Sequence, residues 1–147
     1  MERATGIGGV FVRSAQPDRL RAWYAEHLGV DLEEWGGTVF RSEGGETLVW
    51  AVFDGETDYF GSREQQVMVN YRVRDLDAML AQLRDAGVTV DGPMDHENGR
   101  FGWGVDCDGN RFELWEPGEG QVTAVRRARL RTEASRARPA PASGTAR

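Results

Sequence analysis

The chain has 147 residues and a formal net charge of −6, and 39% of its residues are hydrophobic. This length suits one domain, or two small modules that share a core. The acidic balance argues against nucleic-acid binding, because contacts with phosphates need clustered positive charge.

Two further features place the protein in the cell. No apolar run approaches the roughly 18–20 residues that span a bilayer, and the first residues, MERATGIGGVFVR, lack a signal-peptide pattern. The single cysteine, Cys107, excludes an internal disulfide and fits a reducing compartment. We therefore expect a cytoplasmic protein with neither a membrane nor a nucleic acid as partner.

Charge divides the chain into a body and a tail. Residues 1–117 hold 11 Arg against 22 acidic residues, a net of −11, whereas residues 118–147 hold 7 Arg against 2 Glu, a net of +5. The tail has few large apolar groups to offset the entropy of ordering it. We expect a folded domain over 1–117 and a basic, disordered C-terminal tail over 118–147.

The first half of the body predicts a strand, a helix and three further short strands. The helix begins at Pro17, because proline is favoured at the first helical position, and ends at Gly29, a residue type favoured at the C-cap. The expected strands lie at 7–13 and around 30–34, 38–42 and 46–53.

The second half repeats this order. The strand QVMVNYRV (66–73) alternates, so Met68, Asn70 and Arg72 share one face. The following helix is expected over 75–87, with Asp75 as its N-cap. Further strands are expected near 88–91, 100–106 and 111–116.

The repeated order predicts a paired architecture. Modules of about 5–54 and 65–117 are joined by a linker at 54–65. In each module one helix must cover one face of a small sheet, which leaves the other face open. The sequence therefore predicts an α+β fold in which paired βαβββ modules form a cup-shaped half-barrel.

Three stretches carry a family resemblance: WYxxxLG in the first helix, RDLDAMLAQLRDAGV in the second, and the closing RFGWGVDCDGNRFELWEP. They resemble the vicinal oxygen chelate superfamily, which includes glyoxalase I, extradiol dioxygenases and the bleomycin-resistance proteins. The resemblance covers about residues 5–117. It implies the cup-shaped fold and a homodimer.

The resemblance also implies where a metal would bind. Metal-dependent members place His, Glu or Gln on the first and last strands of each half. The matching residues here are Gly8 or Gly9, the segment 49–51 around Trp50, Met68, and Glu113. A thioether is a poor ligand for Zn²⁺, Fe²⁺, Ni²⁺ or Mn²⁺, and a catalytic site needs at least three protein donors. We therefore expect a metal-independent protein without a cofactor.

Glu113 is a lone carboxylate among large apolar residues in RFELW. If it faces the cup, strand alternation places aromatic and polar side chains beside it, as in many small-molecule sites. Arg72 is a candidate anion stabiliser, or the partner of Glu113 in a cross-strand ion pair. The candidate ligand-binding residues are Phe11, Arg13, Trp50, Met68, Asn70, Trp103 and Trp115.

Three functions compete. The favoured one is a glyoxalase-like binding protein that sequesters an aromatic or anionic small molecule, similar to the bleomycin-resistance binders. The first alternative is a metal-independent isomerase or lyase with Glu113 as general base and Arg72 as anion stabiliser. The second alternative is a metal-dependent lyase or dioxygenase with atypical ligands.

Overall fold

The computed structural model describes residues 1–118 of the chain. The tail expected over 118–147 thus lies outside the described residues, apart from Gly118. Neither helix of the described part is long and apolar enough to cross a lipid bilayer.

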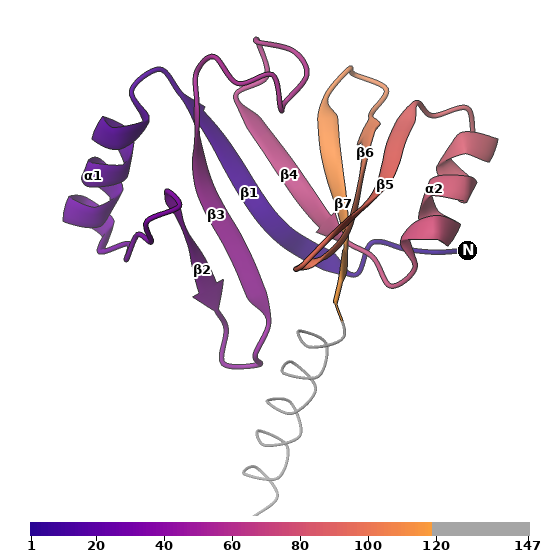
Figure 1. The fold of residues 1–147 in the computed structure, drawn as a ribbon, viewed down its shortest axis with the longest axis horizontal. Helices are drawn as coiled ribbons and strands as arrows, with labels where there is room; N and C mark the ends of the chain where they lie inside the picture. Colours follow the sequence, from indigo (N-terminus) through magenta and orange to yellow (C-terminus); the bar gives the residue numbers. More distant parts are fainter. Residues whose placement is uncertain (119–147) are drawn as a thin grey trace, which may run out of the picture.

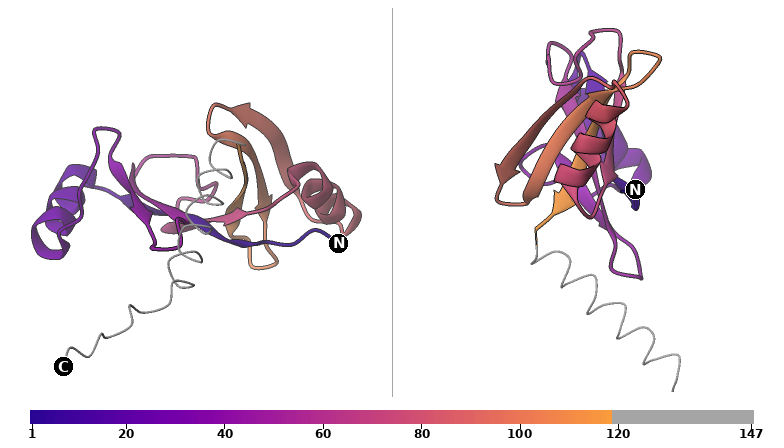
Figure 2. Two further views of the ribbon diagram at one scale, coloured as in Figure 1. Left: turned by 90° about the horizontal axis from the view of Figure 1, so that it is seen from below. Right: turned by 90° about the vertical axis from the view of Figure 1, so that its right-hand side faces the viewer.

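The described residues form one open, strongly curved sheet of seven strands, with a helix at each end (Figures 1 and 2). The strand order is β2-β3-β1-β4-β7-β6-β5. This arrangement confirms the predicted α+β fold class. The elements are β1 (Gly6–Ser14), α1 (Pro17–Leu28), β2 (Gly37–Arg41), β3 (Thr47–Asp54), β4 (Val67–Arg72), α2 (Leu76–Asp85), β5 (Val90–His96), β6 (Gly99–Val105) and β7 (Arg111–Pro117).

The first half has one strand fewer than the sequence predicted. No strand forms around 30–34, so α1 is followed by β2 and β3 alone. The chain turns instead: the Glu33 N–H donates to the carbonyl of Gly37 at 2.9 Å, and Gly36 adopts a φ of 91°. This tight turn leads directly into β2, while the second half shows all five predicted elements.

The two helices are held to the sheet to different degrees. In α2, the Asp75 side chain caps the first turn by accepting from the Ala78 N–H at 2.8 Å, and Leu76, Met79 and Leu80 are buried. These residues form a core against the second half of the sheet. Helix α1 begins at its proline and ends at a left-handed glycine, as predicted, but none of its residues is buried.

The centre of the sheet brings the two halves together. Strand β1 pairs with β3 in parallel and with β4 in antiparallel orientation, and β4 pairs in parallel with β7. In this register Glu113 lies beside Asn70 on one side and beside Trp103 on the other. The β1–β4 pairing shifts register at Gly8, between Ile7 and Gly9, which places a bulge next to Asn70.

A second core fills one part of the cup. The loop between β3 and β4 folds over the sheet and buries Phe60 completely, in contact with Phe11, Ala51 and Met68. Arg13 fastens this loop: its guanidinium donates to four backbone carbonyls of the loop at 2.7–3.2 Å, those of Gly55, Thr57, Ser62 and Gln65. The rest of the cup is left open beside this loop.

Candidate small-molecule site

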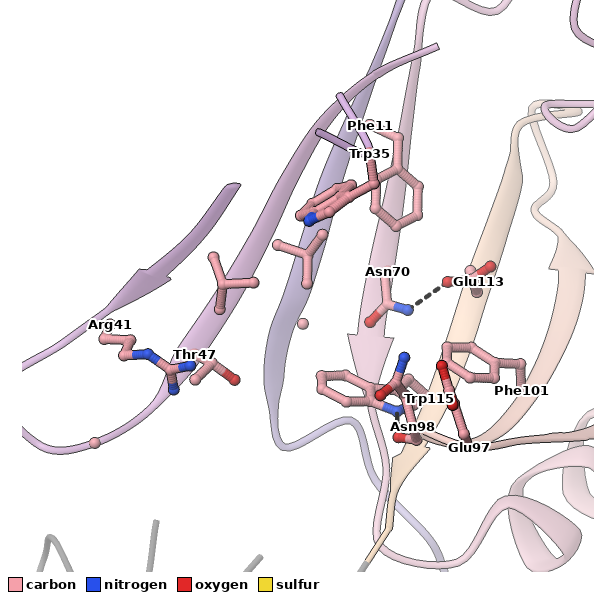
Figure 3. Close-up of a pocket in the computed structure, with 14 residues that line it drawn as sticks. Phe11, Trp35, Arg41, Thr47, Asn70, Glu97, Asn98, Phe101, Glu113 and Trp115 are labelled. Carbon is pink, nitrogen blue, oxygen red and sulfur yellow. Dashed lines mark hydrogen bonds between the residues drawn. The ribbon is translucent and has the colours of Figure 1, made fainter. Parts of the chain in front are cut away.

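The open part of the cup is a cavity of about 680 Å³. Its walls combine aromatic and aliphatic side chains with a few polar groups, and strands from both halves contribute to it (Figure 3). The residues that line it are Gly8, Phe11, Trp35, Val39, Arg41, Gly45, Thr47, Val49, Asn70, Glu97, Asn98, Phe101, Glu113 and Trp115.

Glu113 forms the floor of the cavity and is only 2% exposed. Three neutral donors hold its carboxylate. Asn70 Nδ2 donates to Oε1 at 2.6 Å, Trp103 Nε1 donates to Oε2 at 2.9 Å, and the Tyr59 hydroxyl also donates to Oε2. Among residues 1–118 the carboxylate makes no ion pair, so the pairing with Arg72 that the sequence allowed does not form.

Tyr59 comes from the loop that Arg13 fastens. Its ring stacks on Phe53 at a centroid distance of 5.5 Å, and its hydroxyl accepts from Trp103 Nε1 at 3.3 Å. Burial, and then the negative charge of Glu113, raise the pKa of the Tyr59 hydroxyl above its ordinary value. Tyr59 therefore remains a proton donor to Glu113 at all physiological pH values.

Trp115 and Phe101 form one aromatic wall. Their rings are nearly parallel, with centroids 6.2 Å apart, and the Trp115 indole donates to the carbonyl of Asn98 at 3.0 Å. The Arg72 guanidinium lies 5.1 Å from the centroid of the Trp115 ring, a cation–π distance. These contacts fix the indole plane and so define the shape of the wall.

Arg72 lies next to the cavity without lining it. Its Nη2 donates to Thr47 Oγ1 at 2.9 Å, while its Nε is buried and has no partner within the described part of the chain. Burial lowers the pKa of the guanidinium from its ordinary value, and the charge of Glu46 opposes this shift. Arg72 can act on a ligand only through Thr47 or through the field that it adds to that wall.

The structure brings four of the predicted site residues into the cavity wall: Phe11, Asn70, Glu113 and Trp115. Trp103 stands behind the floor, where it donates to Glu113. These five share one face of the sheet because strand alternation and the parallel β4–β7 register place them there.

Three other predicted ligand-binding residues lie elsewhere. The Arg13 guanidinium donates to backbone carbonyls of the loop, and Met68 is fully buried in the second core. Trp50 is on the opposite face of β3, with its ring 4.6 Å from that of Tyr24 on α1. Residue 50 faces away because it pairs with Val10, whereas Ala51 pairs with Phe11.

Sequence reasoning missed several residues of the site. Tyr59, Trp35, Glu97 and Asn98 belong to loops, where no periodicity indicates direction, and Phe101 was passed over although it alternates in phase with Trp103. Thr47 and Val49, in phase with the cup-facing Ala51, also point inward.

The residues at the floor do not fit the divalent metal that the family resemblance implied for some members. Met68, which was matched to a ligand position, is buried in the second core, and Asn70 is the residue beside Glu113. Asn70 turns its nitrogen, not its oxygen, toward Glu113. Its Oδ1 and the carboxylate oxygens of Glu113 therefore do not face a common position where a metal ion could bind. Within residues 1–118 no group of three or more His, Cys, Asp or Glu residues could hold a metal ion.

The open curved sheet with a concave pocket defines a class of small α+β domains. The family model for the glyoxalase-like domain matches residues 9–115, and the chain belongs to that family. The resemblance to the vicinal oxygen chelate superfamily is thereby confirmed. No curated protein sequence matches the chain at a significant level.

Solved structures share the fold. Methylmalonyl-CoA epimerase from Mycobacterium tuberculosis is 22% identical with a TM-score of 0.60, over 82% of this chain and 93% of that one. A Streptomyces coelicolor methylmalonyl-CoA epimerase variant in complex with 2-nitronate-propionyl-CoA is 21% identical with a TM-score of 0.56, over 76% and 96%. A Legionella pneumophila structure described as an NAD-dependent benzaldehyde dehydrogenase is 17% identical with a TM-score of 0.51, over 73% and 96%. At these identities the likeness concerns the fold alone.

Proposed function

We propose that the chain is a small-molecule binding protein that holds an aromatic ligand in the cavity above Glu113, without a metal ion at the floor. One observation carries this proposal: the cavity of about 680 Å³ with walls of Phe11, Trp35, Phe101 and Trp115. Ligand pockets typically enclose 300–1,000 Å³ and combine apolar walls with a few placed polar groups. The complex of the Streptomyces epimerase with an acyl-CoA analogue is consistent with a cup that accepts small ligands.

An anionic group on the ligand would be met at the β2–β3 end. Arg41 and Thr47 line that end, far from Glu113 in the view of Figure 3, and Arg72 lies behind Thr47. Neither arginine forms an ion pair with a carboxylate of residues 1–118. The site thus supports an aromatic ligand with or without a negative group.

Two dyes of matched shape test the proposal. N-phenyl-1-naphthylamine is neutral and 1-anilinonaphthalene-8-sulfonate adds a sulfonate, and both fluoresce more strongly in apolar sites. We expect saturable binding of at least one dye. The ratio of the two affinities reports whether the end of the cavity that Arg41 lines contributes to binding of the sulfonate. If neither dye binds saturably, the proposal is wrong.

A matched pair of variants locates the dye. Trp35 lines the cavity and is 50% exposed, while Trp23 on α1 is 49% exposed and does not line it. Trp35→Ala should weaken dye binding at least tenfold, whereas Trp23→Ala should leave it unchanged. Equal effects of the two substitutions would place the dye outside the cavity.

Elemental mass spectrometry and thermal melts test metal independence. Natively purified protein should contain no stoichiometric Mn, Fe, Ni or Zn, and its melting temperature should be the same with and without chelator. A stoichiometric ion together with a chelator-sensitive melt would instead support the metal-dependent alternative.

A second candidate is a metal-independent isomerase or lyase with Glu113 as general base. One observation favours it: Oε1 of Glu113 accepts a single hydrogen bond from residues 1–118, so this oxygen at the cavity floor keeps room for a substrate proton. Exchange of the α-proton of methylmalonyl-CoA in D₂O, followed by NMR, tests this reaction class. An enzyme would catalyse exchange and lose it in Glu113→Gln, whereas a binding protein would catalyse none.

A further inference from the structure

We propose that Asn70 and Glu113 form a subsite for a hydrogen-bond donor, so that the ligand is an aromatic molecule with an N–H or O–H group at its buried end. This inference rests on the proposed function and narrows its ligand class. It follows from the orientation of one amide and from the absence of a side chain at residue 8.

The orientation of the Asn70 amide is fixed by chemistry. Its near neighbour is Glu113 Oε1 at 2.6 Å, and a carboxylate only accepts hydrogen bonds, so the amide nitrogen must face it. The carbonyl oxygen Oδ1 therefore points away from Glu113, as Figure 3 shows. Glu113 thus leaves the Asn70 oxygen as an acceptor beside Gly8 in the cavity wall.

This oxygen lacks a partner in the described residues. Asn70 is only 3% exposed, and its Oδ1 is buried without a hydrogen bond. Most buried polar atoms are hydrogen-bonded, and leaving one unpaired is unfavourable. A ligand donor placed here would therefore gain more than the same donor gains on the protein surface.

Gly8 makes room for this oxygen in the cavity wall. A Cβ atom built at residue 8 would overlap Asn70 Oδ1 and would lie 2.8 Å from Trp115 Cε3. The missing side chain at the β1 bulge thus lets the acceptor lie against the backbone of β1. Because Gly8 and Asn70 both line the cavity, the acceptor belongs to the wall that a ligand would contact.

The charges around the floor select against a buried anion. Glu113 is the buried carboxylate of the floor, and Glu97 lines the same end. Among residues 1–118, the one cation that lines the cavity is Arg41, which belongs to β2 at the other end. A carboxylate, phosphate or sulfonate at the floor would meet two carboxylates and an amide oxygen. An N–H or O–H group, neutral or cationic, meets complementary acceptors instead.

Indole and benzofuran test the subsite, because they share a bicyclic shape and differ in a ring N–H against a ring oxygen. Ligand-detected NMR measures both affinities on the full chain. We expect indole to bind at least about tenfold tighter, because benzofuran leaves the buried acceptor unpaired. Gly8→Ala should abolish this preference, because its Cβ atom would overlap Oδ1 and displace the acceptor.

Two further variants keep the test decisive if Gly8→Ala does not fold. Asn70→Ala removes the acceptor and should bring the two affinities together. Asn98→Ala removes another amide from the cavity wall, one whose side chain makes no hydrogen bond within residues 1–118, and should preserve the preference for indole.

The possible failures are distinguishable. If indole and benzofuran bind equally, or the preference survives Asn70→Ala, the donor subsite is wrong while the binding function stands. If neither bicycle binds although a naphthyl dye does, the donor subsite is again wrong. If neither dye binds saturably, the proposed function fails, and the subsite fails with it.

Discussion

Replacing Tyr59 with Phe tests whether the loop between β3 and β4 stabilises the buried carboxylate. The substitution removes one hydroxyl, which donates to Glu113 and accepts from Trp103. The ring can keep its stacking on Phe53, so the loss is confined to hydrogen bonding. Glu113 retains the donors on Asn70 and Trp103.

The magnitude follows from the charge of the acceptor. A hydrogen bond to a charged group contributes about 1.5–3 kcal/mol, against about 0.5–1.5 kcal/mol for a neutral pair. Glu113 is 2% exposed, so water cannot readily replace the lost donor. We expect Tyr59→Phe to lower the free energy of unfolding by about 2 kcal/mol.

Urea unfolding followed by tryptophan fluorescence measures this change, and Tyr71→Phe is the matched control. Tyr71 packs against the α2 core, and its hydroxyl makes no hydrogen bond within residues 1–118. Its substitution should therefore change the free energy of unfolding by less than about 0.5 kcal/mol. If Tyr59→Phe costs no more than Tyr71→Phe, the loop does not stabilise the carboxylate.

Three further predictions concern stability. Because Tyr59 has a raised pKa, its hydroxyl keeps a proton in the folded state that the unfolded chain loses near pH 10. The free energy of unfolding should therefore be unaffected by this group below pH 10 and should fall above it. The fall is at most about 1.4 kcal/mol per pH unit, and it is smaller to the extent that the ring is exposed. Urea midpoints at pH 9 and 11 should show this extra slope in the wild type and not in Tyr59→Phe. Arg13→Met should lower the free energy of unfolding by at least about 3 kcal/mol, since four carbonyls lose a charged donor. It should also speed amide hydrogen exchange in the loop between β3 and β4, and unchanged exchange would show that Arg13 does not fasten this loop. Asp75→Ala should cost about 1 kcal/mol in urea unfolding through loss of the α2 cap, and a value near zero would contradict a capping role.

Strand alternation predicted which face of the sheet the residues at the cavity floor share. Glu113, Asn70 and Trp115 lie on the face that the period of two assigns to them. For Trp50 the same reasoning did not give the face, and the side chain lies on the side of β3 away from the cavity. Its direction depends on the parallel pairing of β3 with β1, and a single strand does not specify the register of a distant partner.

Loop residues were beyond sequence reasoning for a different reason. Tyr59 reaches Glu113 across 54 positions, and its position depends on Arg13, which binds carbonyls rather than side chains. Backbone carbonyls carry no sequence signal, so Arg13 looked like a ligand-binding residue. The segment around 30–34 was misassigned because its apolar alternation resembles a strand, while the turn that follows leaves it without a neighbour to pair with.

The place of β7 in the sheet has a consequence for how the protein acquires its structure during synthesis. It is the last of the seven strands in sequence, yet it lies between β4 and β6 and joins the two halves. Until β7 emerges from the ribosome, β4 has one unpaired edge and the α2 core lacks Leu114. The donors on Asn70, Trp103 and Tyr59 are made earlier than the carboxylate they will hold. The nascent chain can therefore complete its first three strands while the candidate site awaits one late strand, and β4 with its open edge is a place where a chaperone or a second nascent chain would pair.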